Sequence, residues 1–385
     1  PELQSSAVLR DYQNQALDAW TANNSRGIIV LPTGSGKTLV GIKAIAQLNT
    51  PTLVVAPTLD LVAQWRSRLK KEFKTEVGVL GGGEWEVRAL TVSTYDSAYI
   101  HADKLGNRFG LIIFDEVHHL PAAGYRNIAE MFASPFRMGL TATFEREDGL
   151  HEELNRLVGG KVFEKRLKEL TGTHLSPFRL EKIAVELTEE EKAEYETNQK
   201  IFSDYLARIN LVIRGPADFQ KLVMRSGRDP GARRALLARN RARDIAYNSI
   251  SKMETLSEIL ERHNDGRIFI FTEHNKLVYR ISRQFLIPAI TYRTTGKERA
   301  ETLDRFRSGV YRAVVTSKVL DEGIDAPDAD VGVILSGTGS ERAFIQGLGR
   351  ILRKKEGKQA VLYEIVSAET SEVNTARRRK RPLKK

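Results

Sequence analysis

The chain of 385 residues is longer than one hydrophobic core usually serves, so its length predicts two domains. Its hydrophobic (41%) and charged (28%) fractions are those of a soluble globular protein, and no apolar run approaches the roughly 20 residues that cross a bilayer, which excludes a membrane-spanning protein. The lack of cysteine excludes disulfides and thiolate zinc sites, and the net charge of +11 favours polyanionic partners.

In the first part of the chain, short apolar runs alternate with longer amphipathic stretches. The runs that predict strands are residues 27–31, 52–56, 90–93 and 111–114, and residues 38–48 and 59–73 predict helices. This alternation is typical of parallel βαβ units.

The segment LPTGSGKT, residues 31–38, follows a predicted strand and opens a predicted helix, which is the context of a phosphate loop. Gly34 and Gly36 allow backbone N–H groups to approach an anion, and the following helix directs its positive end to the same place. Lys37 would neutralise the β- and γ-phosphates of ATP, and Thr38 would bind Mg²⁺. The expected nucleotide-binding residues of this loop are Gly34, Ser35, Gly36, Lys37 and Thr38.

The segment LIIFDEVHHL, residues 111–120, places two carboxylates and two histidines directly after a buried strand. Such a strand delivers its next residues to the edge of the sheet where the phosphate loop also lies. We expect Asp115 to reach Mg²⁺ through water and Glu116 to orient and deprotonate the attacking water. A zinc site is disfavoured because His118 and His119 are adjacent and thiolates are absent. We expect one histidine to link the site to neighbouring elements and the other to pack.

The middle of the chain, from residue 188 to about 262, contains only helical patterns, and Thr188 begins the first of them as an N-cap. This insertion is strongly basic, and its cations form either a phosphate-binding surface or a solvated face. The cations are Lys221, Arg225, Arg228, Arg233, Arg234, Arg239, Arg241 and Arg243.

Apolar runs resume after about residue 265. Residues 267–271, 313–316, 331–335 and 360–366 predict the buried strands of a second parallel sheet. The last residues, 371–385, read as a basic tail that is either disordered or in contact with phosphates.

The order of motifs resembles superfamily-two helicases over nearly the whole chain. The matching segments are LRDYQ (9–13), LPTGSGKT (31–38), APT (56–58), STY (93–95), DEVH (115–118), TAT (141–143), IFT (270–272), DEGID (321–325) and QGLGRILR (346–353). The string FERED at residues 144–148, followed by a basic helical insertion, is similar to the Arg-Glu-Asp motif and thumb of the XPB branch. This resemblance implies an α/β fold of two RecA-like parallel-sheet domains with a thumb-like helical insertion. We expect the first domain at residues 1–185, the thumb at 186–262, the second domain at 263–370 and the tail at 371–385.

The resemblance also implies roles for residues around the nucleotide. Gln13 would read the adenine edge, Asp325 would approach the ribose, and Gln346 would lie near the γ-phosphate. Arg350 and Arg353 would act as arginine fingers that stabilise charge on the transferred phosphoryl group.

Further roles concern the nucleic acid. Thr141 and Thr143 would couple the phosphate state to the grip on DNA. The motif residues Arg146, Glu147 and Asp148 would help to engage or separate strands. Within the insertion, Arg233, Arg234, Arg239 and Arg241 are the expected DNA contacts.

Two departures from the family pattern stand out. Gly347 occupies a position where the family usually has arginine, which could loosen that turn and slow hydrolysis. The N-terminal domain that relatives use to recognise distorted DNA is not expected, because the adenine-binding motif begins at Leu9.

The leading hypothesis is an ATP-dependent DNA helicase or translocase that needs ATP and Mg²⁺ and acts on duplex or forked DNA in excision repair or transcription. The alternatives are a nucleotide-gated DNA-binding scaffold with little turnover, an RNA helicase or restriction-type motor of the same superfamily, and a basic DNA-binding protein without nucleotide chemistry. A repair nuclease or a transcription–repair complex is the expected partner. The expected location is the cytoplasm of a prokaryote, or the nucleus if the source is eukaryotic.

Overall fold

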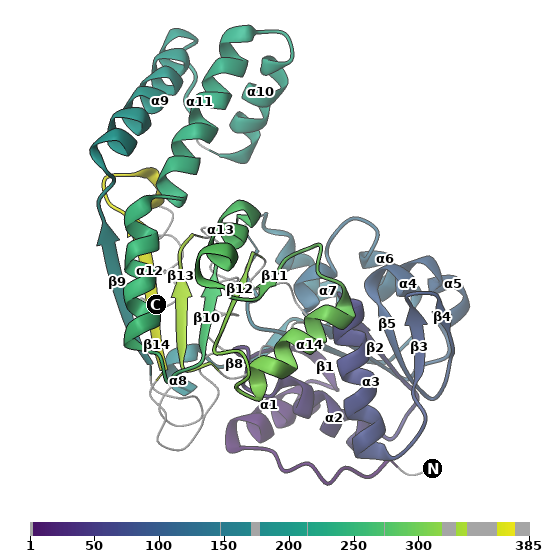
Figure 1. The fold of residues 1–385 in the computed structure, drawn as a ribbon. Helices are drawn as coiled ribbons and strands as arrows, with labels where there is room; N and C mark the ends of the chain where they lie inside the picture. The colour runs from purple at the N-terminus through teal and green to yellow at the C-terminus, as the bar shows by residue number, and fades with distance from the viewer. Residues whose placement is uncertain are drawn as a thin grey trace. The chain divides into compact units, whose positions relative to one another are not determined.

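The computed structural model describes residues 3–146, 148–170, 178–213, 215–272, 274–317, 329–336 and 360–373. The chain divides into two compact units, and in the described parts the first covers residues 3–170 and the second residues 178–373 (Figure 1). No helix within these described ranges is long and apolar enough to cross a membrane.

The first unit is built on an eight-stranded sheet with the order β4-β3-β5-β2-β6-β7-β1-β8. Neighbouring strands are parallel except β3 and β4, which form an antiparallel pair. The strands are β1 (Arg26–Val30), β2 (Thr52–Ala56), β3 (Gly78–Gly81), β4 (Glu84–Trp85), β5 (Leu90–Thr94), β6 (Leu111–Asp115), β7 (Phe136–Thr141) and β8 (Lys161–Glu164). The expected parallel βαβ arrangement is therefore confirmed.

The central strands of this sheet are buried along their whole length, because helices cover both of its faces. One core joins alternate strand residues such as Leu53, Ile112 and Phe114 to the helices α4 to α7. The helices of the unit are α1 (Asp11–Ala22), α2 (Lys37–Leu48), α3 (Leu59–Phe73), α4 (Tyr95–Ile100), α5 (Ala102–Leu105), α6 (Arg126–Met131), α7 (Leu154–Leu157) and α8 (Leu167–Leu170), with 3₁₀ turns η1 (Val117–His119) and η2 (Leu150–Glu153).

The second unit contains a six-stranded parallel sheet with the order β11-β12-β10-β13-β14-β9. Its strands are β9 (Phe178–Val185), β10 (Ile268–Phe271), β11 (Ala289–Ile290), β12 (Ala313–Thr316), β13 (Val331–Ile334) and β14 (Ala360–Ser367). Helices α12 (Ile250–Arg262), α13 (Asn275–Phe285) and α14 (Gly296–Arg307) belong to the same unit.

Three helices of this unit form the basic insertion, which we call the thumb helices: α9 (Glu189–Arg208), α10 (Pro216–Ser226) and α11 (Pro230–Tyr247). In Figure 1, α9 and α11 lie side by side with α10 against α11. Thr188 caps α9 in a reciprocal capping box with Glu191, which confirms the expected helix start. At the start of α11, Asp229 accepts hydrogen bonds from the N–H groups of Gly231 and Ala232.

The expected domain boundaries are wrong in two places. Residues 178–185, assigned from the sequence to the first domain, form β9 and pair in register with β14 over eight residue pairs. Residues 250–262, assigned to the insertion, form α12, whose Met253, Leu256 and Ile259 pack in the core of the second sheet. Both errors arise because local patterns carry no information about the distant partner on which a segment packs.

Candidate functional site

The phosphate loop connects the end of β1 to the first residue of α2, Lys37. Gly34 and Gly36 both have φ +82°, in the left-handed region that favours glycine. A Cβ added at Gly36 would lie 2.5 Å from Nε2 of Gln13, so this position has no room for a side chain. The loop is therefore shaped as the sequence pattern predicts.

Two side chains from α1 hold this loop. The Tyr12 hydroxyl and the Gln13 amide Nε2 both donate to the carbonyl oxygen of Ser35, at 2.6 and 2.7 Å. The amide oxygen of Gln13 accepts the backbone N–H of Arg10 at 2.8 Å. The amide nitrogen of Gln13 thus supports the loop, and its amide oxygen caps the start of α1. The expected contact of Gln13 with adenine stays a prediction.

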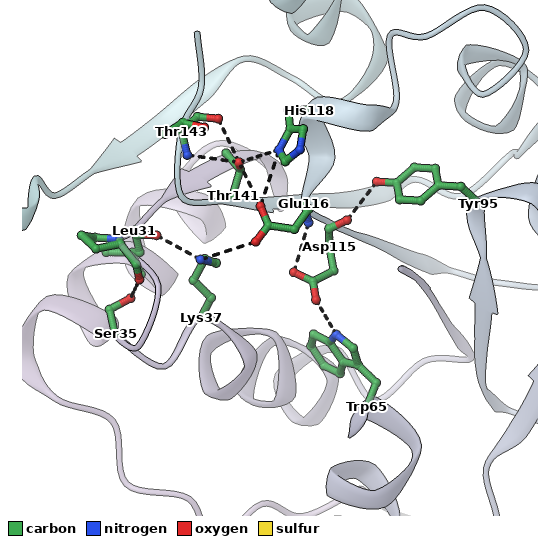
Figure 2. Close-up of polar contacts among 11 residues, drawn as sticks. Leu31, Ser35, Lys37, Trp65, Tyr95, Asp115, Glu116, His118, Thr141 and Thr143 are labelled. Carbon is green, nitrogen blue, oxygen red and sulfur yellow. Dashed lines mark hydrogen bonds and ion pairs between the residues drawn. The ribbon is translucent and has the colours of Figure 1, made fainter. Parts of the chain in front are cut away.

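The two expected carboxylates lie where β6 ends, and both are buried. Oδ2 of Asp115 accepts the indole N–H of Trp65 at 2.8 Å, and the Tyr95 hydroxyl donates to the Asp115 carbonyl at 3.1 Å. Glu116 has φ +48°, an uncommon conformation for a residue other than glycine. The turn after β6 is therefore held in a strained form that directs the two carboxylates differently (Figure 2).

Figure 2 shows Glu116 between the phosphate loop and the end of β7. Its Oε1 lies 3.9 Å from Nζ of Lys37, which also donates to the carbonyl of Leu31 at 3.2 Å. Its Oε2 lies 3.5 Å from Nδ1 of His118 and 3.4 Å from Oγ1 of Thr141. The structure thus brings together Lys37, Glu116 and Thr141 from three separate segments of the chain.

Burial raises the pKa of the Asp115 carboxyl to about 6, and the neighbouring charge of Glu116 adds to this effect. The hydrogen bond from Trp65 and the charge of Lys37 act in the opposite direction. A nearby positive charge would stabilise the ionised form of a carboxyl group in such a position.

The two adjacent histidines have different surroundings. His118 is fully buried and its Nδ1 lies 3.1 Å from Oγ1 of Thr141, while the His119 ring lies 5.8 Å from that of Tyr95. This confirms that one histidine links the site to a neighbouring element and that the other packs. Within the described ranges, no group of three or more metal-ligating side chains is found.

The segment after β7 folds back on the turn that carries the carboxylates. The Thr143 N–H donates to Oγ1 of Thr141 at 3.2 Å. The Arg146 guanidinium pairs with both carboxylate oxygens of Asp148, at 2.9 and 2.6 Å, and its Nη1 donates to the carbonyl oxygen of His118. The side chain of Arg146 is only 18% exposed. The contacts of Trp65 and Arg146 could not be predicted from local sequence patterns, because both depend on tertiary packing.

The residues present fit a Mg²⁺–triphosphate. The left-handed glycines leave the loop open to an anion, and the buried Oγ1 of Thr33 has no partner among the described residues. Thr38 and Asp115 offer the oxygen ligands that Mg²⁺ prefers. The binding of nucleotide by these residues of the first unit stays a prediction.

The four arginines expected to contact DNA fall into two pairs. Arg239 packs 4.4 Å from the Phe219 ring centroid, and Arg241 forms an ion pair with Glu194 at 2.6 Å. Arg233 and Arg234 are exposed on α11, and their side chains form no hydrogen bond or ion pair with another described residue. The guanidinium groups of Arg239 and Arg241 thus have partners within the thumb helices, and the DNA contacts of all four arginines stay a prediction.

Several expected site residues lie outside the described parts of the chain. They are Glu147, Asp325, Gln346, Arg350 and Arg353, together with Gly347 and residues 374–385 of the basic tail.

Comparisons with known proteins identify the family of this chain. Residues 6–146 match the family described as "Type III restriction enzyme, res subunit", and residues 251–355 match "Helicase conserved C-terminal domain". The chain is 47% identical to the "DNA 3'-5' translocase XPB2" of Sulfurisphaera tokodaii, over 99% of this chain and 86% of that protein. The chain belongs to the XPB family. Helicase activity implies the use of ATP, in agreement with the phosphate loop.

More distant members of the XPB family are longer than this chain. It is 31% identical to the "DNA 3'-5' helicase XPB" of Mycobacterium tuberculosis, covering 97% of this chain and 63% of that protein. It is 30% identical to the "General transcription and DNA repair factor IIH helicase/translocase subunit XPB/SSL2" of Saccharomyces cerevisiae, covering 97% and 43%. The fold is similar to the Pyrococcus furiosus Hef helicase domain, with a TM-score of 0.62, 20% identity, and coverage of 96% and 97%.

Proposed function

We propose that this XPB-family chain couples ATP hydrolysis to 3'-5' movement on duplex or forked DNA. The observation that carries the proposal is the buried contact of Glu116 with Lys37 and Thr141. Glu116, a carboxylate that can activate water, contacts Lys37, which is proposed to bind phosphate. It also contacts Thr141, which precedes the next loop. The printed names of the relatives supply the polarity and the nucleic acid.

The residues of the first unit divide the chemistry of hydrolysis between them. Lys37 and the loop N–H groups bind the β- and γ-phosphates. Thr38 and, through water, Asp115 would hold Mg²⁺, which would neutralise phosphate charge. Glu116 orients the attacking water and accepts its proton, because its carboxylate is buried beside the phosphate loop. Gln13 would contact adenine.

The proposal also includes residues outside the described parts of the chain, and their roles come from the resemblance. Asp325 would contact the ribose, Gln346 the γ-phosphate, and Arg350 and Arg353 the charge that develops during transfer. Residues 186–249 would act as a thumb on the DNA, with Arg233 and Arg234 as its contacts.

The same proposal includes a role in excision repair or transcription. The partner would be a repair nuclease or a transcription–repair complex. This part of the proposal is supported by the printed name of the yeast relative, which is a subunit of a transcription and DNA repair factor. The high identity with an archaeal protein supports a prokaryotic cytoplasm as the location.

The test is steady-state ATP hydrolysis by the whole chain, alone and with duplex DNA, forked DNA, single-stranded DNA or single-stranded RNA. We expect stimulation by DNA that Glu116→Gln abolishes, while the exposed control Glu190→Gln retains it. Displacement of a third strand from a DNA triplex would measure movement along the duplex. Nucleotide binding without turnover would favour the scaffold, and stimulation by RNA alone would favour an RNA helicase.

A further inference from the structure

The solvent-facing side of α13 and the segment after it carry positive charge without negative charge. Residues 275–297 contain five cations and no aspartate or glutamate. The cations are Lys276, Arg280, Arg283, Arg293 and Lys297. Such a stretch is unusual in a chain with 49 acidic residues.

The helical repeat places three of these cations in one row. Helix α13 buries Leu277, Val278 and Ile281 against the second sheet, so the opposite side faces solvent. A shallow hollow of about 540 Å³ lies along this side, lined by Lys276, Tyr279, Arg280, Arg283 and Gln284. The interval of seven residue steps from Lys276 to Arg283 corresponds to roughly 10 Å along the helix axis.

The contacts of these residues leave their charge uncompensated. Arg280 donates through Nη1 to the carbonyl oxygen of Asn248 at 2.6 Å, which fixes it beside the end of α11. Neither Lys276 nor Arg283 has a carboxylate partner among the described residues, a set that excludes Glu273. Arg293 Nε donates to the neighbouring Tyr292 hydroxyl at 2.9 Å, which is a neutral partner.

The nearby acids have other partners. Asp244, whose charge acts on His274 at the start of α13, accepts a hydrogen bond from the Asn248 side chain at 3.0 Å. Glu298 accepts the N–H of Thr295 at 2.9 Å as part of a capping box. Within the described residues, a set that lacks Glu273, no carboxylate pairs with the cations of this face.

We propose that Lys276, Arg280 and Arg283 bind the phosphodiester backbone of duplex DNA, as a contact surface separate from the thumb arginines. A row of cations at intervals of four and three residues suits a ligand with regularly repeated negative charges. The lining consists of cations, one amide and one tyrosine, whereas a protein partner would be expected to need an apolar centre. The inference rests on the proposed action on DNA.

The test measures binding of fluorescently labelled duplex DNA to the whole chain by anisotropy at several KCl concentrations. The variant is Lys276→Gln with Arg283→Gln. The control is Arg262→Gln with Arg312→Gln, which removes the same charge from exposed positions after α12 and before β12. DNA-free ATPase activity and the thermal midpoint report on folding.

We expect the variant to bind roughly tenfold or more weakly at 0.1 M salt, and its log–log salt slope to be shallower by about 2, since each phosphate contact contributes about 0.9. The control should match the wild type. If the wild type binds DNA and the variant and the control have the same affinity and salt slope, the proposed DNA contact at α13 is wrong. The surface would then be expected to bind an acidic protein partner, and the proposed function would stand. No DNA binding by the wild type would overturn the proposed function as well.

Discussion

At the scale of single residues, Asp115 is held in an electrostatically unfavourable state. Its pKa of about 6 lies above the ordinary value of 3.8, first because of burial and then because of Glu116. The sign follows from proton linkage: ionised Asp115 opposes folding above pH 6, and this cost disappears as the pH falls towards 4. In the nucleotide-free site, an additional positive charge near Asp115 would therefore stabilise its ionised carboxylate.

Removing the neighbouring charge should change this pKa. In the Glu116→Gln variant, we expect the pKa of Asp115 to fall below that of the wild type, because a like charge is lost while burial remains. Carboxyl-carbon NMR titration of the nucleotide-free chain measures it, with Glu190→Gln as control. An unchanged midpoint would show that Glu116 is not the neighbouring charge that matters.

Arg146 offers a second prediction at this scale. Because its guanidinium holds the carbonyl of His118, Arg146→Ala should release the turn that carries Glu116 and lower ATP turnover severalfold even without DNA. Arg126→Ala, which removes an exposed arginine with a 3.8 Å ion pair to Glu153, is the control. Normal DNA-free turnover with lost DNA stimulation would instead indicate a direct contact between Arg146 and DNA.

At the scale of secondary-structure elements, the thumb arginines separate into two functional groups. Arg233→Gln with Arg234→Gln should weaken duplex binding and leave the thermal midpoint unchanged, because both side chains face solvent. Arg239→Gln with Arg241→Gln should lower the midpoint, since it removes the contacts to Phe219 and Glu194. Anisotropy titrations and thermal unfolding of both variants test this. Equal effects of the two variants on both measurements would contradict the division.

Helix α12 is joined to the segment after β14 by a fully buried ion pair. Nζ of Lys252 lies 2.6 Å from Oε2 of Glu372 and 2.8 Å from the carbonyl oxygen of Leu335. Lys252→Met should destabilise the second unit by about 3–5 kcal/mol, because it leaves a buried carboxylate without its partner. Adding Glu372→Gln should recover part of the loss. Urea unfolding of the single and double variants measures both effects, and additive losses would argue against coupling.

The sequence could predict these elements only where the signal is local. Strands such as β2 and β6 were predictable because five successive buried residues mark a central parallel strand. The partner of β9 lies about 180 positions later in the chain, and the core that α12 joins includes residues as distant as Tyr363. The phosphate loop and the Asp115–Glu116 pair are contiguous motifs, whereas Trp65 and Arg146 join the site only through the fold.

At the scale of the whole molecule, each of the two units has its own core. Scanning calorimetry should therefore resolve two unfolding transitions. ADP at 100 times its Kd should stabilise the one that contains the phosphate loop by about 2.7 kcal/mol. Lys37→Ala should remove this shift and keep both transitions. A single transition that ADP shifts as a whole would show that the units unfold together.

The pairing of β9 with β14 has a consequence for synthesis on the ribosome. Strand β9 forms the outer edge of the second sheet, yet its partner is made about 180 residues later. At 5–20 residues per second, β9 would wait roughly ten to forty seconds for its hydrogen bonds. The first unit can fold during that interval, while an eight-residue edge strand stays available to wrong partners. The newly made chain is therefore most vulnerable to aggregation just before its last strand appears.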